Sequence, residues 1–480
     1  MSPATTVESL PGDSEPFRLR LARVLSILVF AGLLALLVIA AIPYGTAEAW
    51  WKAFFICVAF AFGILWLIEG YLSGAWVTTG WSIIVPATAL VAFSLLQTIS
   101  LGNAQISGIA TPAWRTISAD PYETRFFALQ LAALVLCGVL LFRYLSTTRR
   151  LWIVLNLIIA LAVASAIFAI VRQTTQHSLG FGLPLLKPDS GYGQFINKNH
   201  FAFLMEMALG LIVGMILGGG VKKEKVLLYV AALIPVWTAL VLCRSRGGLI
   251  AMFVEVVVAA FLLTGAFQSQ PSRIEGSRNE SPAKLFAILR SPPFRITLFL
   301  ILVCGIVLGT LYLGGERLAS SIEDTRTEFS ADSNEIRQRA SRSETWSLTG
   351  KMIAAHPVLG IGMGAYWVVV PAFHDASGTL TPQEAHNDYL ELLASGGLVG
   401  FAIGVWFLFA VAKKAQANLG SSHRLRRAAC LGACIGIAGV AVHSLVDFGL
   451  HMLVNALVFT TLIVIATSEQ PWHTEAIRES

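Results

Sequence analysis

One histidine stands where acid–base chemistry would be possible. His386 begins the sequence HNDYLELLASGGLVG, with Asn387 and Asp388 directly after it and a long apolar stretch beyond. A histidine side chain, with an ordinary pKa of about 6.5, can take a proton from a hydroxyl at neutral pH. We therefore interpret His386 as a candidate general base. The alternative is that it only caps the helix that follows.

Three arginines have positions that would suit binding of phosphate groups. Arg244 and Arg246 lie in the sequence CRSRGG, between two apolar stretches, and Arg342 lies in a long polar segment. A guanidinium group presents a fork of donors that matches phosphate oxygens two at a time. Convergence of two or three such groups would suit a diphosphate. For Arg244 and Arg246 the alternative is that they extend from a helix end towards the membrane surface.

Other ionisable and polar residues stand inside or beside apolar stretches, where they are costly and often mark a site. Candidates for supporting roles are Asn199, His200, Asn387, His443 and Asp447, with His451 nearby. His443 and Asp447 are four residues apart and would share a helix face. The alternative is a hydrogen-bonded pair that locks the helices together. Glu206 and Glu255 also lie within apolar stretches, and the sequence assigns neither of them a role.

The polar segment that contains Arg342 is expected to be structured. A helix is predicted over about residues 333–354, with Arg342 and Trp346 on one face, and it should stop at His356-Pro357 because the residue before a proline avoids the α region. The sequence GIGMG follows and predicts tight turns. It lacks the strand-turn-helix setting of a nucleotide-binding fingerprint, so that interpretation is rejected.

The elements that must position these residues are membrane-spanning helices. Of the 480 residues, 56% are hydrophobic and only 13% are charged, with a mean hydropathy of +0.71. The predicted fold class is all-α and polytopic, with about twelve spans that are each long enough to cross a hydrocarbon layer of about 30 Å. They lie near residues 21–43, 50–70, 80–100, 124–145, 151–172, 199–219, 225–243, 247–266, 295–314, 387–412, 428–447 and 450–468.

Basic residues in alternate short loops predict the orientation. Lysine and arginine precede the first predicted span and recur after spans four, six, eight and ten, which places both termini in the cytoplasm. The largest outer loop then runs over residues 315–386, between spans nine and ten. The net charge of +6 follows from this pattern, and nucleic acid is not an expected partner.

Several of these motifs together resemble the O-antigen ligase and O-antigen polymerase superfamily of bacterial envelope glycosyltransferases. The stretches that carry the resemblance are NKNHFA, SRGG, R-x-x-x-W followed by HPVLGIGMG, HNDYLELLASGGLVG and HSLVDF, which occur in this order. They cover roughly residues 195–450. We predict three regions: spans one to five in 1–198, a ligase-like core in 199–450, and the last span with a cytoplasmic tail in 451–480.

The resemblance implies a multi-pass protein of the bacterial inner membrane with a periplasmic active site. It implies glycan transfer from an undecaprenyl diphosphate-linked donor, within membrane lipids, to lipid A–core or to a growing glycan. By the family pattern, Arg246 and Arg342 would bind the diphosphate, Arg244 is a weaker candidate, and His386 would be the base. No metal ligand set is visible in the sequence, so a metal-independent transfer without a cofactor is expected.

Other functions are compatible with parts of the sequence. An O-antigen or exopolysaccharide polymerase would need the same donor site as a ligase, and transfer of the glycan to a protein would as well. A polysaccharide or lipid transporter with twelve spans would place its longest loop in the cytoplasm, whereas here the longest loop is predicted outside. A non-catalytic envelope scaffold would tolerate replacement of His386.

Overall fold

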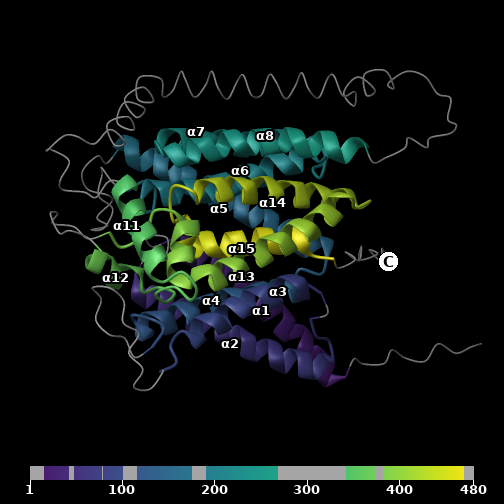
Figure 1. Ribbon diagram of the computed structural model, residues 1–480. Coiled ribbons are helices and arrows are strands. Elements are labelled where there is room, and N and C mark those ends of the chain that lie inside the picture. The colour runs from purple at the N-terminus through teal and green to yellow at the C-terminus, as the bar shows by residue number, and fades with distance from the viewer. Residues whose placement is uncertain are drawn as a thin grey trace, which may run out of the picture.

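The fold is a bundle of long helices with two short helices across one end (Figure 1). The computed structural model describes residues 16–42, 48–77, 79–100, 116–175, 191–268, 342–373 and 382–469. Within these ranges no residue belongs to a β-strand, and the only β-type pairing consists of isolated bridges. The predicted all-α class is therefore correct for the described part of the chain.

The helices have these bounds in chain order: α1 Phe17–Ala41, α2 Ala49–Ser73, α3 Trp81–Leu96, α4 Pro121–Tyr144, α5 Thr148–Thr175, α6 Lys198–Leu217, α7 Lys223–Leu242, α8 Arg246–Gln268, α11 Arg342–Ala355, α12 Tyr366–Phe373, α13 Asp388–Leu419, α14 Arg424–His443, η2 Gly449–His451 and α15 Leu453–Thr467. The short 3₁₀ helix η2 joins α14 to α15. The expected stop at His356-Pro357 is confirmed, because α11 ends one residue earlier. Only the last part of the predicted 333–354 helix lies in a described range.

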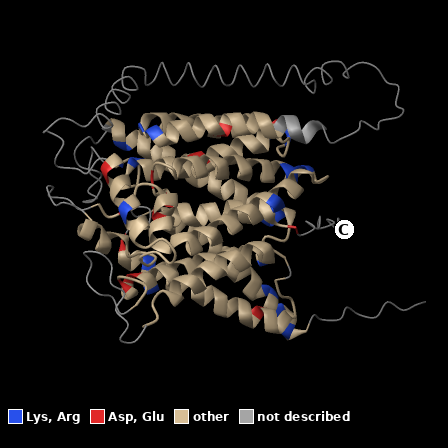
Figure 2. Cartoon of the chain, in the orientation of Figure 1, with Lys and Arg blue, Asp and Glu red and all other residues tan. Residues whose placement is uncertain are grey.

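The protein is a multi-pass membrane protein. Eight of the described helices are long and apolar enough to cross a membrane, and α3 and α15 are shorter apolar helices. Charged side chains gather at the two ends of the helices and are sparse along their middle (Figure 2). The predicted count of about twelve is not established, because the span at 295–314 and much of the loop at 315–386 lie outside the described residues. The predicted span at 428–447 ends early, at His443.

Helices α6 and α14 approach each other at backbone contact. Gly210 and Gly214 of α6 face Gly436 and Gly432 of α14, and a Cβ atom added at Gly214 would lie 2.1 Å from the Cα atom of Gly432. Small residues at four-residue spacing allow such close packing between membrane helices, where dispersion contacts replace the hydrophobic effect. This contact fixes the N-terminal end of α6 relative to the C-terminal end of α14, and those ends carry several of the candidate site residues.

A methyl group at this contact should destabilise the protein. We expect Gly214→Ala to cost about 1–3 kcal/mol, because the added carbon meets backbone that has no side chain to move aside. Thermal unfolding in detergent would measure the loss. Gly350→Ala in α11 is the matched control: a Cβ there meets nothing within 4 Å, so the change should be neutral or stabilising. Equal effects of the two changes would contradict the packing argument.

The GIGMG segment docks onto the start of α13. Gly360, Gly362 and Gly364 all have positive φ angles, of 68°, 107° and 81°, as expected for tight turns. The N–H groups of Ile361 and Gly362 donate to the carbonyl oxygens of Ala394 and Ser395, at 3.1 and 3.0 Å. The segment thus joins α11 and α12 rigidly to the first turns of α13, directly after His386.

Candidate functional site

His386 lies immediately before α13 in a strained backbone conformation. Its φ angle is 51°, and Arg244 (φ 56°) is the other non-glycine residue of the described ranges with positive φ. The helix cap is Asn387, whose side chain accepts from the N–H groups of Tyr389 and Leu390, both at 3.0 Å. The capping interpretation of His386 is therefore wrong. A non-glycine residue held in this region costs free energy, and such residues concentrate at functional sites.

Asp447 is the centre of the site. It lies in the turn after α14, with its side chain fully buried. Its Oδ1 atom is 3.8 Å from both His386 Nδ1 and His200 Nε2, and its Oδ2 atom is 3.4 Å from Arg342 Nη2. Asn199 donates from Nδ2 to the same Oδ2 atom. One carboxylate thus brings together four of the residues singled out from the sequence.

The carboxylate of Asp447 is held in its charged form. Burial by itself would raise its pKa, but the imidazoles of His386 and His200 and the N–H of Phe448, which donates at 2.9 Å, together lower the pKa below its ordinary value. Asp447 is therefore a fixed negative charge at neutral pH. Such a charge can orient an imidazole and stabilise the imidazolium that forms when the imidazole accepts a proton.

Helix α11 contacts the site through both residues of the R-x-x-x-W motif. Arg342, its first residue, reaches Asp447 as described above, and Trp346, one turn later, donates from Nε1 to the carbonyl oxygen of Ala385 at 3.1 Å. Ala385 directly precedes His386, and its own N–H donates to Glu391 Oε2 at 2.9 Å. The four-residue spacing thus allows one helix face to hold the segment that carries His386.

The turn between α7 and α8 is held by a buried chain of polar contacts. Ser245 Oγ accepts from the N–H of Gly248 at 3.1 Å and lies 3.5 Å from His443 Nε2. His443 Nδ1 is 2.7 Å from Oε1 of Glu206 on α6. All three polar side chains are buried, which supports the interpretation of His443 as part of an internal pair. Its partner is Glu206, and the pair positions the turn between Arg244 and Arg246.

Four cationic residues lie at or just before the N-terminal ends of α6, α8 and α11. We call Lys198, Arg244, Arg246 and Arg342 the basic cluster. The positive charges of the three arginines act on Lys198, and all four side chains are at least partly exposed. Positive groups from separate elements at one place favour a polyanionic ligand, and guanidinium groups favour phosphate in particular.

A second polar cluster includes His451, whose ring also packs against the ring of Phe448. His451 Nδ1 is 3.5 Å from Glu384 Oε2, and His451 Nε2 is 3.6 Å from Asp388 Oδ1 and 3.7 Å from Glu391 Oε1. Burial by itself lowers the pKa of His451, but the three surrounding carboxylates raise it to about 10. We call these four residues the His451 cluster.

The spacing within this cluster would also allow a metal ion. Glu384, Glu391 and His451 can each offer one ligand atom, and these atoms lie within 4.8 Å of one another. The sequence did not show this set, because its members come from three different elements. A protonated His451 has an N–H on each ring nitrogen, and each nitrogen faces a carboxylate. The imidazolium form therefore accounts for the arrangement.

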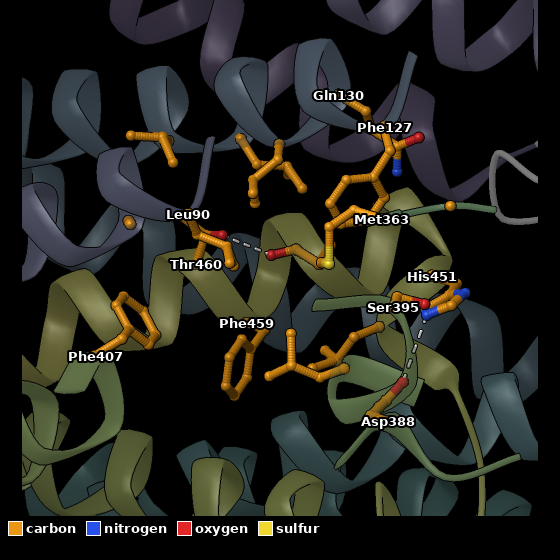
Figure 3. Close-up of a pocket in the computed structure, with 18 of the residues that line it drawn as sticks. Leu90, Phe127, Gln130, Met363, Asp388, Ser395, Phe407, His451, Phe459 and Thr460 are labelled. Atoms are coloured by element: carbon orange, nitrogen blue, oxygen red, sulfur yellow. Dashed lines mark hydrogen bonds and ion pairs between the residues drawn. The ribbon is translucent and has the colours of Figure 1, made fainter. Parts of the chain in front are cut away.

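A cavity of about 550 Å³ opens beside the His451 cluster and extends between α3, α4, α13 and α15. Figure 3 shows Asp388, Ser395 and His451 near one end, with Phe459 and Phe407 farther along. Its volume is in the range of about 300–1,000 Å³ that is usual for ligand pockets. No residue of this cavity belongs to the basic cluster.

Comparison with known families gives one match that overlaps these residues. Residues 230–405 match the family model described as O-antigen ligase. This segment of the chain is similar to the O-antigen ligase superfamily. The match supports a function of the O-antigen ligase or polymerase type. No curated protein matches the chain.

The O-antigen ligase match contains only part of the site. SRGG, R-x-x-x-W, GIGMG and the segment that begins at His386 lie within it, whereas Asn199, His200 and Asp447 lie outside. The fold joins the two groups, because the turn after α14 places Asp447 beside His386 and Arg342. The site is therefore shared between the matched region and helices α6 and α14.

The structure brings several of the residues predicted for the site together around Asp447, which the sequence marks only as a supporting candidate. The sequence gives Lys198, within NKNHFA, no role. Glu206 had no assignment, and it pairs with His443. Glu255 is buried in α8 beside Gly439 and is not among the contacts of Asp447. Lys198 stands between Asn197 and Asn199. Its positive charge in this polar setting is the signal that could have grouped it with the three arginines as a candidate phosphate-binding residue.

Proposed function

We propose that the protein is an inner-membrane glycosyltransferase that acts at the periplasmic face. It moves a glycan from undecaprenyl diphosphate to an acceptor hydroxyl, as an O-antigen ligase in lipopolysaccharide biosynthesis with lipid A–core as the acceptor. The observation that carries the proposal is the position of His386 beside the fixed charge of Asp447 and next to the basic cluster. The basic residues of the predicted inner loops support the orientation.

In the proposed reaction, the acceptor oxygen attacks the anomeric carbon while the bond from that carbon to the diphosphate breaks. His386 takes the hydroxyl proton, and Asp447 stabilises the imidazolium that results. The electron pair of the broken bond stays on the carrier diphosphate, whose developing charge Arg246 and Arg342 stabilise, with Arg244 and Lys198 nearby. Attack opposite the leaving group inverts the anomeric centre. The arginines supply the positive charge that a metal ion would otherwise provide.

An O-antigen or exopolysaccharide polymerase is the second candidate, because the same donor site and base would serve it. Deletion of the gene distinguishes the two functions by the intermediate that accumulates. A ligase predicts carrier-linked long chains together with unsubstituted lipid A–core. A polymerase predicts carrier-linked single repeat units. Normal envelope glycans and no accumulated carrier-linked intermediate would contradict both functions.

A further inference from the structure

The cavity beside the His451 cluster has the shape of a site for one hydrocarbon chain. Residues of α4 line it from Glu123 to Phe142, which is roughly 28 Å along the helix axis at about 1.5 Å per residue. This is close to the thickness of about 30 Å of a bilayer's hydrocarbon core. Away from its mouth the lining is mainly apolar, with Leu134, Phe407 and Phe459 among the contributors. A long, mainly apolar space of this kind fits an extended alkyl or prenyl chain.

The mouth of the cavity is rich in carboxyl groups, whereas the basic cluster has none. Four carboxylates line it, those of Glu123, Glu384, Asp388 and Glu391, against the cations Lys52 and His451. Carboxylates accept hydrogen bonds from hydroxyl groups, and they repel phosphate. The mouth therefore favours an uncharged, hydroxyl-rich head group and disfavours the diphosphate end of a carrier lipid.

The mouth is also next to the proposed base. The rings of His386 and His451 both pack edge-on against the ring of Phe448, with centroid distances of 4.8 and 5.5 Å. Asp388, which contacts His451, is two residues from His386. A head group seated at the mouth would therefore lie near the residue that would deprotonate it.

We propose that this cavity binds the hydrocarbon chain of a second lipid, a single-chain amphiphile with an uncharged polyhydroxylated head, and that this lipid is a further class of acceptor. The role as acceptor rests on the proposed function, whereas the binding preference does not. Two lipids would then be sorted by charge: the diphosphate donor at the basic cluster, and the neutral amphiphile at the carboxylate-lined mouth. A hydroxyl of its head group would lose its proton to His386.

Photolabelling of the full-length protein in nanodiscs tests the binding. The probes are decyl maltoside and decyl phosphate, each with a diazirine on the alkyl chain. We expect the maltoside probe to label α4 and α15 about tenfold more than the phosphate probe does. Leu131→Trp fills the cavity and should remove this labelling, whereas Leu129→Trp, on the exposed face of the same helix, should not. Equal labelling by both probes, or labelling that survives Leu131→Trp, would overturn the proposal.

A charge change at the mouth tests the selectivity without filling the cavity. Glu123→Lys should shift the preference from the maltoside towards the phosphate probe, whereas Glu48→Lys, which changes an acid that does not line the cavity, should leave the preference unchanged. An unchanged preference in Glu123→Lys would contradict the role of the mouth. Both proteins are first compared with the wild type by thermal unfolding.

Transfer of glycan to decyl maltoside separates this inference from the proposed function. With a purified carrier-linked donor, the wild type should glycosylate the maltoside, and His386→Ala should bind the probe without transferring glycan to it. Transfer to lipid A–core but not to the maltoside would refute the further acceptor class and leave the proposed function intact. Selective labelling by the maltoside probe, with no transfer to any acceptor, would refute the proposed function and leave the lipid site intact.

Discussion

Replacement of His386 by alanine is expected to lower the rate of glycan transfer by about 10²–10⁴-fold, the usual contribution of a general base. The protein should still insert and fold, because the cap of α13 is Asn387 and the side chain of His386 is 38% exposed. The rate is measured with purified protein, a carrier-linked donor and an excess of acceptor. Full activity of His386→Ala in this assay would show that another group removes the proton.

Two further variants separate the chemistry of His386 from its backbone. His386→Asn keeps a residue that tolerates the left-handed conformation but removes the base, so it should be as inactive as the alanine variant and at least as stable. His423→Ala is the matched control, because His423 caps α14 with its side chain and lies away from the proposed site. Activity in His386→Asn would indicate that conformation matters here and proton transfer does not.

Replacement of Asp447 by asparagine is expected to reduce transfer by about 10²-fold or more. Asparagine keeps the shape of the side chain but removes the charge that faces His386, His200 and Arg342. The imidazolium of His386 then loses its counter-charge, so the loss should fall on kcat more than on KM for the acceptor. Single-turnover kinetics and saturation curves measure the split.

The control for Asp447 must be another buried acid outside the site. Glu255 is buried in α8 and is not among the contacts of Asp447, so Glu255→Gln tests the general cost of removing a buried carboxyl group. Asp447→Glu restores the charge at a slightly different place and should recover part of the rate. If Asp447→Asn and Glu255→Gln reduced kcat equally, Asp447 would have a structural role alone.

The apolar helices could be predicted from sequence because membrane insertion depends on local composition. Runs of apolar residues long enough to cross the hydrocarbon layer predicted α1, α2 and α4 to α7 within a few residues. The predicted continuation of α14 to residue 447 was wrong, because the chain leaves the helix after His443. Composition does not show this stop, since HSLVDF has no glycine or proline.

The local motifs were also predictable, because each depends on residues close in sequence. The four-residue spacing of Arg342 and Trp346 placed both on one face of α11, and the glycines of GIGMG predicted its turns. The same stretches carried the resemblance to the O-antigen ligase superfamily, which the match over residues 230–405 supports. The sequence alone therefore determined the membrane class, and it predicted the resemblance to the O-antigen ligase superfamily and the candidates His386, Arg246 and Arg342.

Only the tertiary structure decided how these candidates are related. Asp447 is 61 residues from His386 and 105 from Arg342 in sequence, so no local pattern could show that one carboxylate faces both. The close glycine contact of α6 with α14 sets the positions of Asn199, His200 and Asp447. Spacing along one helix is fixed by covalent geometry, whereas contacts between helices depend on the packing of the whole bundle.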